Sequence, residues 1–360
     1  MSEPIPQGPE ALTAPWFYRT VAARHPLIPA ARALTVDNGV RQGMMSRVCR
    51  ITPAYAGPAE AAPQSFIVKL AAADPEMRQR EANRQAALKE VRFYQTLAAR
   101  IDVRTPACYL ADVDFESGYH VLVLEDLVTL AQRLPESGCL QREAERAVDA
   151  LARLQAAWWG RGELEGLEWL KQPERLNPAE VRARHRRWWP AFREIAGPLL
   201  PEELLTFGDR LGDRFADLMN RLLFEPPRTL RHGDFSLSNL FFAAEGPPVV
   251  IDWQMLSRGK GAWDLAWFLG QSLTIEQRRA WEADLLDRYR RALIGGGVRD
   301  YPVDVCLADY RLAIAQRFGT LISSVVVLPF SAAQKEEILR VQVPRNVAAI
   351  LDHGGVELIG

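Results

Sequence analysis

The chain has 360 residues, of which 48% are hydrophobic and 25% charged, and its formal net charge is −1. This length is enough for two lobes, and the balanced charge shows no basic surplus that calls for nucleic acid and no acidic tail, although it leaves room for a local basic patch. We therefore expect no nucleic-acid partner, no obligate protein partner, no membrane-spanning helix and no signal peptide. Its four cysteines form no CxxC pair, which predicts free thiols in a reducing, cytoplasmic compartment.

The first third of the chain carries strand patterns. Short β-branched or alternating runs, bounded by Gly, Pro or Asp, predict strands at Ser46–Ile51, Ser65–Leu70 and His120–Leu124. Between the second and third runs, a stretch rich in Ala, Glu, Arg and Gln predicts one long helix over residues 75–100. Residues 1–127 are therefore expected to form a small β-rich lobe with one main helix.

Helical patterns predominate after about Leu127. The predicted helices cover residues 142–159, 178–195, 201–223, 275–293, 303–328 and 332–351. One hairpin-like interval, Asn239–Trp253, lies between the third and fourth of them. A β-rich front and a helical back predict an α+β fold with two lobes, the second lobe spanning residues 128–360.

The hairpin interval places two candidate metal ligands at its ends. Two apolar runs flank a Gly/Pro turn near Gly246, with Asn239 before the first run and Asp252 after the second. Antiparallel pairing brings the ends of a hairpin side by side, so we expect the amide oxygen of Asn239 to converge with the carboxylate of Asp252. Hard oxygen ligands of this kind suit Mg²⁺.

Asp234 lies five residues before Asn239, on the loop that enters the hairpin. In phosphoryl transfer, metal ions neutralise the phosphates while a separate carboxylate orients the attacking hydroxyl and accepts its proton. Two aspartates set apart by a hairpin meet this requirement. Each residue alone also fits an ordinary turn or strand end, but their order and spacing together favour phosphoryl transfer.

The segment His232-Gly-Asp-x4-Asn239, followed by Ile251-Asp-Trp-Gln254, resembles the aminoglycoside phosphotransferase and choline kinase-like superfamily. The Trp-Gln pair after Asp252 is most similar to its ecdysteroid-kinase-like branch. The resemblance implies a bilobal protein-kinase-like fold and a kinase that uses ATP and Mg²⁺ to phosphorylate a hydroxyl of a small molecule. It also implies Asp234 as the catalytic base, with Asn239 and Asp252 as the magnesium ligands.

A kinase of this kind needs an upstream lysine at the nucleotide phosphates and a glutamate that pairs with it. Lys69 ends an apolar strand, where it either needs a partner or reaches solvent. Glu81 and Glu90 both qualify as partners by type. We choose Glu90, because it shares a helix face with apolar side chains and because Glu90-Val-Arg-Phe-Tyr94 matches the Glu-Val-x-Phe-Tyr of the family.

The candidate phosphate-covering loop is the stretch 37–46, which contains Gly39, Gly43 and Ser46. Its glycines would let backbone N–H groups approach the phosphates. A plain Asn-Gly turn is the alternative interpretation.

The segment Val121–Leu127 resembles the hinge of the family, Leu-Glu-Asp-Leu. This resemblance implies that backbone groups of Glu125, Asp126 and Leu127 bind adenine. We expect the carboxylates of Glu125 and Asp126 to have structural roles.

The segment after Asp252 argues against a protein kinase. Only Met255–Gly261 precedes Trp263-Asp264-Leu-Ala, no Ala-Pro-Glu follows, and Gly233 replaces the arginine that would bind a loop phosphate. Asp264 matches a family aspartate and is expected to hydrogen-bond the catalytic loop. Gln155 stands where the branch often has histidine.

The sequence leaves the acceptor open. The pairs Trp158-Trp159 and Trp188-Trp189 fit core packing, with a pocket for a lipophilic alcohol as the alternative. No dense acidic cluster indicates a polycationic aminoglycoside. Two other functions remain as alternatives: a nucleotide-binding pseudokinase that acts as a scaffold without turnover, and an α-helical binding protein with an incidental hairpin.

Overall fold

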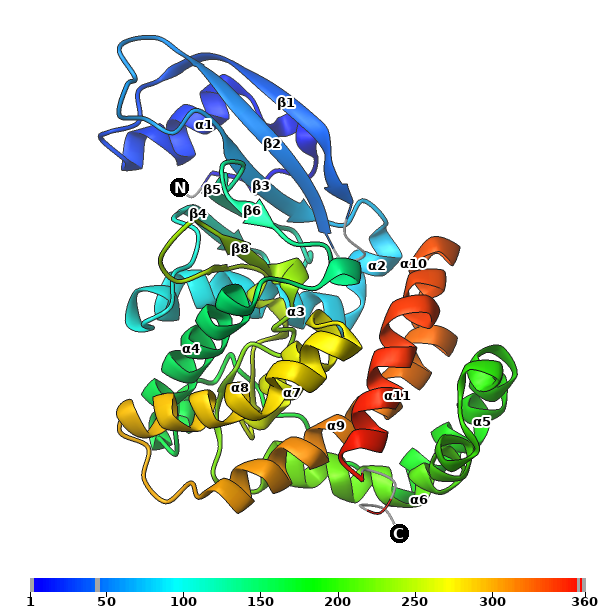
Figure 1. Cartoon of the computed structure of the whole chain (residues 1–360). Coiled ribbons are helices and arrows are strands. Elements are labelled where there is room, and N and C mark those ends of the chain that lie inside the picture. The colour runs from blue at the N-terminus through cyan, green and yellow to red at the C-terminus, as the bar shows by residue number, and fades with distance from the viewer. Residues whose placement is uncertain (1–2, 43–45, 355–356, 358–360) are drawn as a thin grey trace. The chain divides into compact units, whose positions relative to one another are not determined.

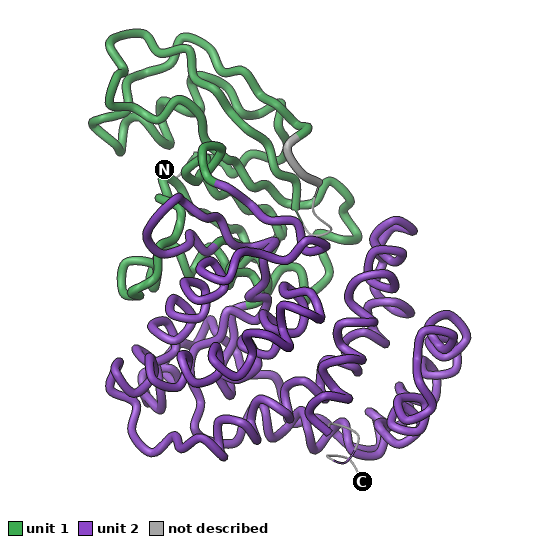
Figure 2. Tube along the Cα trace, viewed as in Figure 1, with its two compact units in different colours: residues 1–130, 251–255 green, residues 131–250, 256–360 purple. Residues whose placement is uncertain are grey.

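The computed structural model describes residues 3–42, 46–354 and 357 (Figure 1). The chain divides into two compact units (Figure 2). The first unit comprises residues 1–130 and 251–255, and the second comprises residues 131–250 and 256–360. Among the described residues, no helix is both long enough and apolar enough to cross a membrane.

The first unit is built on a five-stranded antiparallel sheet with the order β1–β2–β3–β5–β4. Its strands are β1 (Ala31–Gln42), β2 (Ser46–Tyr55), β3 (Phe66–Ala71), β4 (Cys108–Val113) and β5 (His120–Glu125). The three predicted strands are confirmed as β2, β3 and β5. The other two strands, β1 and β4, were not predicted, because most described side chains of β1 are exposed, most of β4 are only partly buried, and the apolar alternation is weak.

The predicted loop over residues 37–46 is wrong for its first half, because β1 continues to Gln42. The Asn-Gly pair that suggested a turn lies within this edge strand, inside the irregularity of the β1–β2 register between Asp37 and Arg41. There the backbone N–H of Gly39 donates to Oδ1 of Asp37 at 2.8 Å. A bulge in an edge strand accommodates glycine without ending the pairing.

Helices cover the two faces of this sheet. On one face, α1 (Ala14–Thr20) packs through Phe17 against Phe66, with 5.4 Å between the ring centroids. Near the other strands, α3 (Glu81–Arg92) contacts β4 and β5. Because side chains alternate along a strand, Lys69 points away from the face that carries Phe66 and Val68.

The predicted single helix over residues 75–100 is divided. It comprises α2 (Pro75–Gln79), α3, a π-helical turn (Phe93–Leu97) and a 3₁₀ turn (Ala98–Arg100). Arg80 interrupts the first two with an extended backbone, φ −60° and ψ 128°. The side chain of Asn83 donates to the carbonyl of Met77 across this break at 2.6 Å. No Pro or Gly marks Arg80, so propensity alone predicted a continuous helix.

The second unit is mostly helical. Its helices are α4 (Gln141–Trp158), α5 (Pro178–Ala196), α6 (Glu202–Phe224), α7 (Ala262–Ser272), α8 (Ile275–Gly295), α9 (Val303–Val326), α10 (Ala332–Glu337) and α11 (Val343–Asp352). The predicted helices are confirmed except the last, which a π-helical turn at Ile338–Gln342 divides into α10 and α11. Helix α7 was not predicted, because it is buried on nearly all sides and shows no amphipathic period.

Two small sheets flank the loop of the second unit that bears Asp234 and Asn239. β7 (Thr229–Arg231) pairs with β10 (Ser257–Gly259), and β8 (Leu240–Phe242) lies between β6 (Ala131–Gln132) and β9 (Val249–Val250). The predicted hairpin is confirmed as β8–β9, in which Leu240 pairs with Val250. The loop that bears Asp234 joins β7 to β8.

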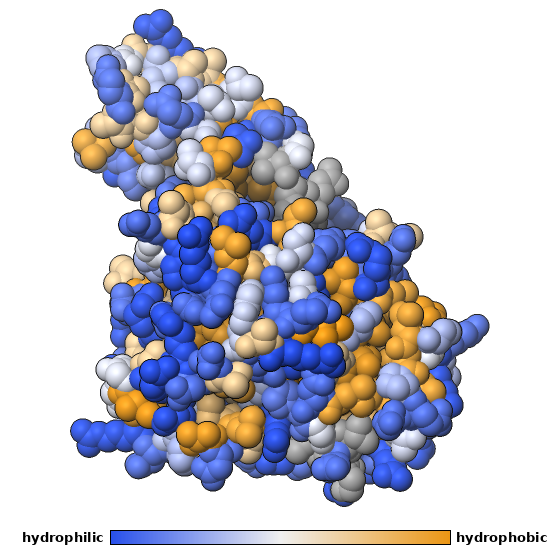
Figure 3. Space-filling view, in the orientation of Figure 1, coloured by the Kyte–Doolittle hydropathy of each residue, from blue (hydrophilic) through white to orange (hydrophobic). Residues whose placement is uncertain are grey.

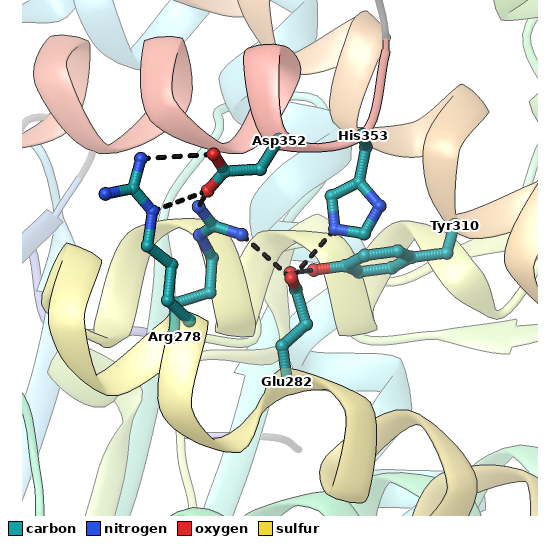
Figure 4. A network of polar contacts seen from close by, with 6 residues as sticks. Arg278, Glu282, Tyr310, Asp352 and His353 are labelled. Carbon is teal, nitrogen blue, oxygen red and sulfur yellow. Dashed lines mark hydrogen bonds and ion pairs between the residues drawn. The ribbon is translucent and has the colours of Figure 1, made fainter.

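A buried polar cluster joins the end of α11 to α8 and α9 (Figure 4). Glu282 of α8 accepts from Arg278 at 2.8 Å and from the hydroxyl of Tyr310, and it lies 2.8 Å from Nε2 of His353. Arg278 also pairs with Asp352, the last residue of α11. Burial raises the pKa of Glu282, but the contacts with His353, Tyr310 and Arg278 outweigh burial and lower it below its usual value.

This cluster should make the protein less stable in acid. Glu282 has a folded-state pKa below its unfolded value, so its contribution is present above about pH 4.3 and is lost as the pH falls through the folded pKa. We expect Glu282→Gln to lower the free energy of unfolding at pH 7 by about 1–3 kcal/mol. In urea titrations between pH 7 and pH 3, the free energy of unfolding should fall less with decreasing pH in this variant than in the wild type. Equal pH slopes would contradict the assignment, and Glu180→Gln on the exposed start of α5 is the control.

Candidate active site

In the first unit, Lys69 is held between two carboxylates. Its Nζ lies 2.6 Å from Oε2 of Glu90 on α3 and 2.8 Å from Oδ1 of Asp252. The predicted pairing with Glu90 is confirmed, whereas Glu81 contacts Arg84 at the exposed start of α3. Burial lowers the pKa of Lys69, but Asp252 and Glu90 outweigh burial and raise it above its usual value, so the ammonium stays charged.

The backbone around Asp252 is fixed by the residue that follows it. Asp252 has φ 65°, in the left-handed region that aspartate tolerates better than most residues. Trp253 is fully buried and stacks on Phe93, with 3.9 Å between ring centroids and 10° between planes. Gln254 donates to Oδ2 of Asp252 at 3.2 Å. Residues 251–255 therefore belong to the first unit, whereas they were predicted to lie in the second lobe, residues 128–360.

The buried ion pair predicts unequal effects of two matched substitutions on α3. Glu90→Gln should lower the free energy of unfolding by about 1–3 kcal/mol, because Lys69 loses one of its two charged partners in a buried site. Glu81→Gln should cost about 0–1 kcal/mol, since its carboxylate is exposed. Urea denaturation of both variants checks this, and equal losses would contradict the structural importance of Glu90.

The structure describes some, but not all, of the residues of the predicted phosphate-covering loop. Ser46 begins β2, is buried, and lines a small cavity together with Glu90, His120 and Gln254. Gly39 lies in β1, and Gly43 lies outside the described residues. Ser46 is thus the member of this group that the structure brings to the Lys69–Glu90 pair.

At the predicted hinge, both carboxylates make contacts within the first unit. Asp126 accepts from Arg50 at 2.5 Å and from the hydroxyl of Ser65 at 2.6 Å. Glu125 ends β5, and its side chain accepts from the backbone N–H of Ala107 at 3.1 Å. The expected structural use of these two carboxylates is confirmed. Leu127 is buried directly after them.

In the second unit, Asn239 is bonded to Asp234. Its Nδ2 donates to the backbone carbonyl of Asp234 at 2.9 Å and to Oδ2 at 3.0 Å. Asn239 is 3% exposed. Because its Nδ2 donates to Asp234, its amide oxygen is directed to the opposite side of the amide group. A hard oxygen of this type fits a magnesium ion, as does the carboxylate of Asp252 in the first unit.

Asp264 on α7 holds the backbone of the loop before Asp234. Its two oxygens accept from the backbone N–H groups of His232 and Gly233, each at 2.8 Å. Gly233 has φ 87°, which favours glycine and turns both N–H groups toward one carboxylate. The predicted role of Asp264 is confirmed.

The sequence profile of the phosphotransferase enzyme family matches residues 57–302, a range that includes Lys69, Asp234 and Asp252. The chain belongs to this family. No curated protein sequence matches it.

Solved structures show the same fold for this phosphotransferase. A protein from Ralstonia eutropha JMP134, assigned to the aminoglycoside phosphotransferases, is 15% identical, with TM-score 0.55 and coverage of 96% of this chain and 97% of that one. Spectinomycin phosphotransferase with ADP and spectinomycin is 11% identical, with TM-score 0.54 and coverage of 95% and 97%. An aminoglycoside 2″-phosphotransferase with gentamicin is 14% identical, with TM-score 0.52 and coverage of 88% and 91%. At these identities the likeness shows a kinase-like α+β fold.

Gln155 of this phosphotransferase hydrogen-bonds the carboxylate of Asp264. It is completely buried, and its Nε2 donates to Oδ2 of Asp264 at 3.2 Å and to the carbonyl of Gly261 at 3.1 Å. The hydroxyl of Tyr289 donates to Oε1 of Gln155. A Cβ on Gly261 would lie 2.6 Å from that oxygen, so a larger residue would displace the amide. This role of Gln155 was not predicted; the only sequence signal for it is that glutamine stands where the ecdysteroid-kinase-like branch often has histidine.

The paired tryptophans of the phosphotransferase mainly pack the core. Trp158 and Trp189 are 3% and 6% exposed. The indole of Trp189 donates to Asp209 at 2.7 Å and contacts the ring of Phe192. Trp159 packs edge-on against Tyr301. Core packing is therefore the better interpretation of these pairs.

Proposed function

We propose that this phosphotransferase is a kinase that uses ATP and Mg²⁺ to phosphorylate a hydroxyl of a small molecule. The observation that carries the proposal is the anchored catalytic loop. Asp234 is bonded to Asn239, and Asp264 fixes the backbone just before it. Catalysis of phosphoryl transfer rests on positioning and on charge stabilisation, so a carboxylate held in this way suits the orientation of a hydroxyl and acceptance of its proton.

The other residues of the site have roles on the nucleotide side. Lys69, oriented by Glu90, binds the nucleotide phosphates, and Ser46 with Gly39 and Gly43 covers them. Backbone groups of residues 125–127 bind adenine. Asn239 and Asp252 supply oxygen ligands for magnesium, which neutralises charge on the phosphates when it is bound.

Three observations support a small-molecule acceptor. The similar structures include complexes named for gentamicin with one phosphotransferase and for ADP and spectinomycin with another. Only residues 256–261 separate the Asp252 segment from α7, which leaves no length for the activation segment of a protein kinase. The Trp253-Gln254 pair favours the ecdysteroid-kinase-like branch.

The four free cysteines suit a reducing compartment such as the cytoplasm.

The test has two stages. Mg-ATP should raise the melting temperature, because a ligand that binds the folded state stabilises it. ATP consumption should then appear with members of a panel of alcohols, amino sugars, sterols and hydroxy acids. A rise without turnover on the whole panel would favour the pseudokinase, and no rise would favour a binding protein without nucleotide. Mg-GTP is run in parallel, since similar structures are also named as GDP complexes.

A further inference from the structure

Two tryptophans of helix α7 each contact an arginine from another element of the same unit, Arg231 of β7 and Arg317 of α9. Trp263 and Trp267 are half-buried and one helical turn apart, so they share a face. The guanidinium carbon of Arg231 lies 4.5 Å from the ring centroid of Trp263, and that of Arg317 lies 3.5 Å from the ring centroid of Trp267. Both distances are within the range of cation–π attraction.

The two guanidiniums are buried without the partners that buried charges need. Arg231 and Arg317 are 2% and 3% exposed. Only Nη2 of each is bonded, to the hydroxyl of Ser257 at 3.1 Å and to the amide oxygen of Gln271 at 2.7 Å. Neither has an ion pair with a described carboxylate. A buried cation in this state is costly, so a missing anionic partner is expected.

The unpartnered atoms are all hydrogen-bond donors. Among the buried guanidiniums of the described residues, Arg231 and Arg317 alone leave both Nε and Nη1 without a partner. The indole N–H groups of Trp263 and Trp267 are unpartnered as well. By contrast, the buried Arg258 of the same unit is paired with Glu165. Hydrogen-bond donors without acceptors indicate a ligand rich in oxygen atoms.

These donors lie near the catalytic loop. Burial lowers the pKa of Arg317 to about 9, and the charge of Asp234 acts against this shift. Arg231 directly precedes His232 at the end of β7, and its pKa is lowered by burial to about 10 against the effect of Asp264. Hydrophobic side chains gather over α11 and α5 of this unit (Figure 3). These side chains provide an apolar surface for the carbon skeleton of an acceptor. They supply no anionic partner for the guanidiniums.

We propose that these two tryptophan–arginine pairs form an acceptor subsite that binds an oxyanion, a carboxylate or a phosphate, on the molecule that is phosphorylated. The inference rests on the proposed kinase function. Two positive charges repel a polycation, so the subsite selects against aminoglycosides and in favour of anionic hydroxy compounds. The rings of Trp263 and Trp267 cover the guanidiniums, and entry of the anion requires the indoles to turn aside.

Matched acceptor pairs test the charge preference directly. Hydroxy acids are compared with their methyl esters, and sugar phosphates with the parent sugars, in an assay of ADP release. The wild type should prefer the charged member of a pair by at least about ten-fold in kcat/KM, as expected for a charge-assisted hydrogen bond. Arg317→Met should lose this preference through a higher KM for the acceptor while the KM for ATP stays unchanged. Arg317→Lys should recover part of it.

The control variant is Arg258→Met, which removes a buried arginine of the same unit whose charge is already paired. It should keep the acceptor preference even if it lowers the melting temperature. A preference of the wild type for neutral or cationic members, or an unchanged preference in Arg317→Met, would overturn the subsite. Preference for carboxylates alone or phosphates alone identifies which oxyanion the subsite takes.

A binding experiment decides the subsite independently of turnover. Inorganic phosphate, compared with chloride at equal ionic strength, should raise the melting temperature of the wild type and of Arg258→Met but not of Arg317→Met. The absence of this rise in the wild type would sink the subsite even if the kinase is active. A rise that depends on Arg317, found together with no turnover on any acceptor, would keep the subsite and refute the kinase.

Discussion

Asp234→Ala should lower kcat by about 10²- to 10⁴-fold, the usual contribution of a positioned acid–base group. The carboxylate orients the hydroxyl and accepts its proton, and the catalytic loop loses no backbone contact when the side chain is shortened. The backbone carbonyl of Asp234 still accepts from Asn239 at 2.9 Å, and Asp264 still holds the preceding N–H groups. The rise produced by Mg-ATP should therefore stay close to that of the wild type, while the melting temperature should fall because the buried Arg317 and the amide of Asn239 lose the Asp234 carboxylate.

The measurement is a comparison of ADP release and thermal shift in one preparation. Asp213→Ala removes an exposed aspartate from α6 of the same unit and should leave both quantities unchanged. Full phosphotransfer by Asp234→Ala would refute its role. Loss of activity together with loss of the Mg-ATP shift would point to a collapsed site and not to a missing base.

Asp264→Ala should be the most destabilising of the substitutions considered, by about 3–5 kcal/mol, the range for removing one partner from a buried charged network. The carboxylate is completely buried and accepts from two backbone N–H groups and from Gln155. Its removal leaves these donors unsatisfied. It also removes the nearby negative charge that acts on the buried Arg231. The catalytic loop then loses its anchor, so activity should fall even in the molecules that remain folded.

Urea denaturation gives the loss of stability, and ADP release below the unfolding transition gives the loss of activity. Asp264→Asn should be nearly as harmful, because its new amide N–H group would face other donors. Asp284→Ala, at an exposed position of α8, is the control for loss of one charge. A stable, fully active Asp264→Ala would show that Gly233 and its neighbours hold the loop without it.

The parts of the site that the sequence predicted share a local cause. The residues from His232 to Asp252 form one hairpin and its entry loop, and the Gly/Pro turn limits how they can pair. Lys69 and Glu90 are far apart in the chain, but a charged residue in an apolar strand needs a partner, and the apolar face of α3 selects Glu90 over Glu81. These predictions succeed because short-range pattern and buried charge leave few alternatives.

The parts that the sequence missed depend on tertiary contacts. The Asn-Gly pair at Gly39 favours a turn, yet pairing with β2 extends β1 through it. Arg80 breaks a helix that propensity would continue. Gln155 and Arg317 come to the site from α4 and α9, and neither position carries a motif of its own. Their roles come from burial and from the partners they have or lack, which only the folded chain shows.

Because residues 251–255 belong to the first unit, neither unit corresponds to one continuous stretch of the sequence. A fragment ending at Leu130 would lack Trp253, which stacks on Phe93, and Asp252, which pairs with Lys69. The complementary fragment would carry that pentapeptide with its buried indole deprived of its ring partner. Exchange of lobes between relatives at the single junction near residue 130 would therefore produce chimaeras with a mismatched insert. When lobes are exchanged between relatives, residues 1–130 and 251–255 must be transferred together.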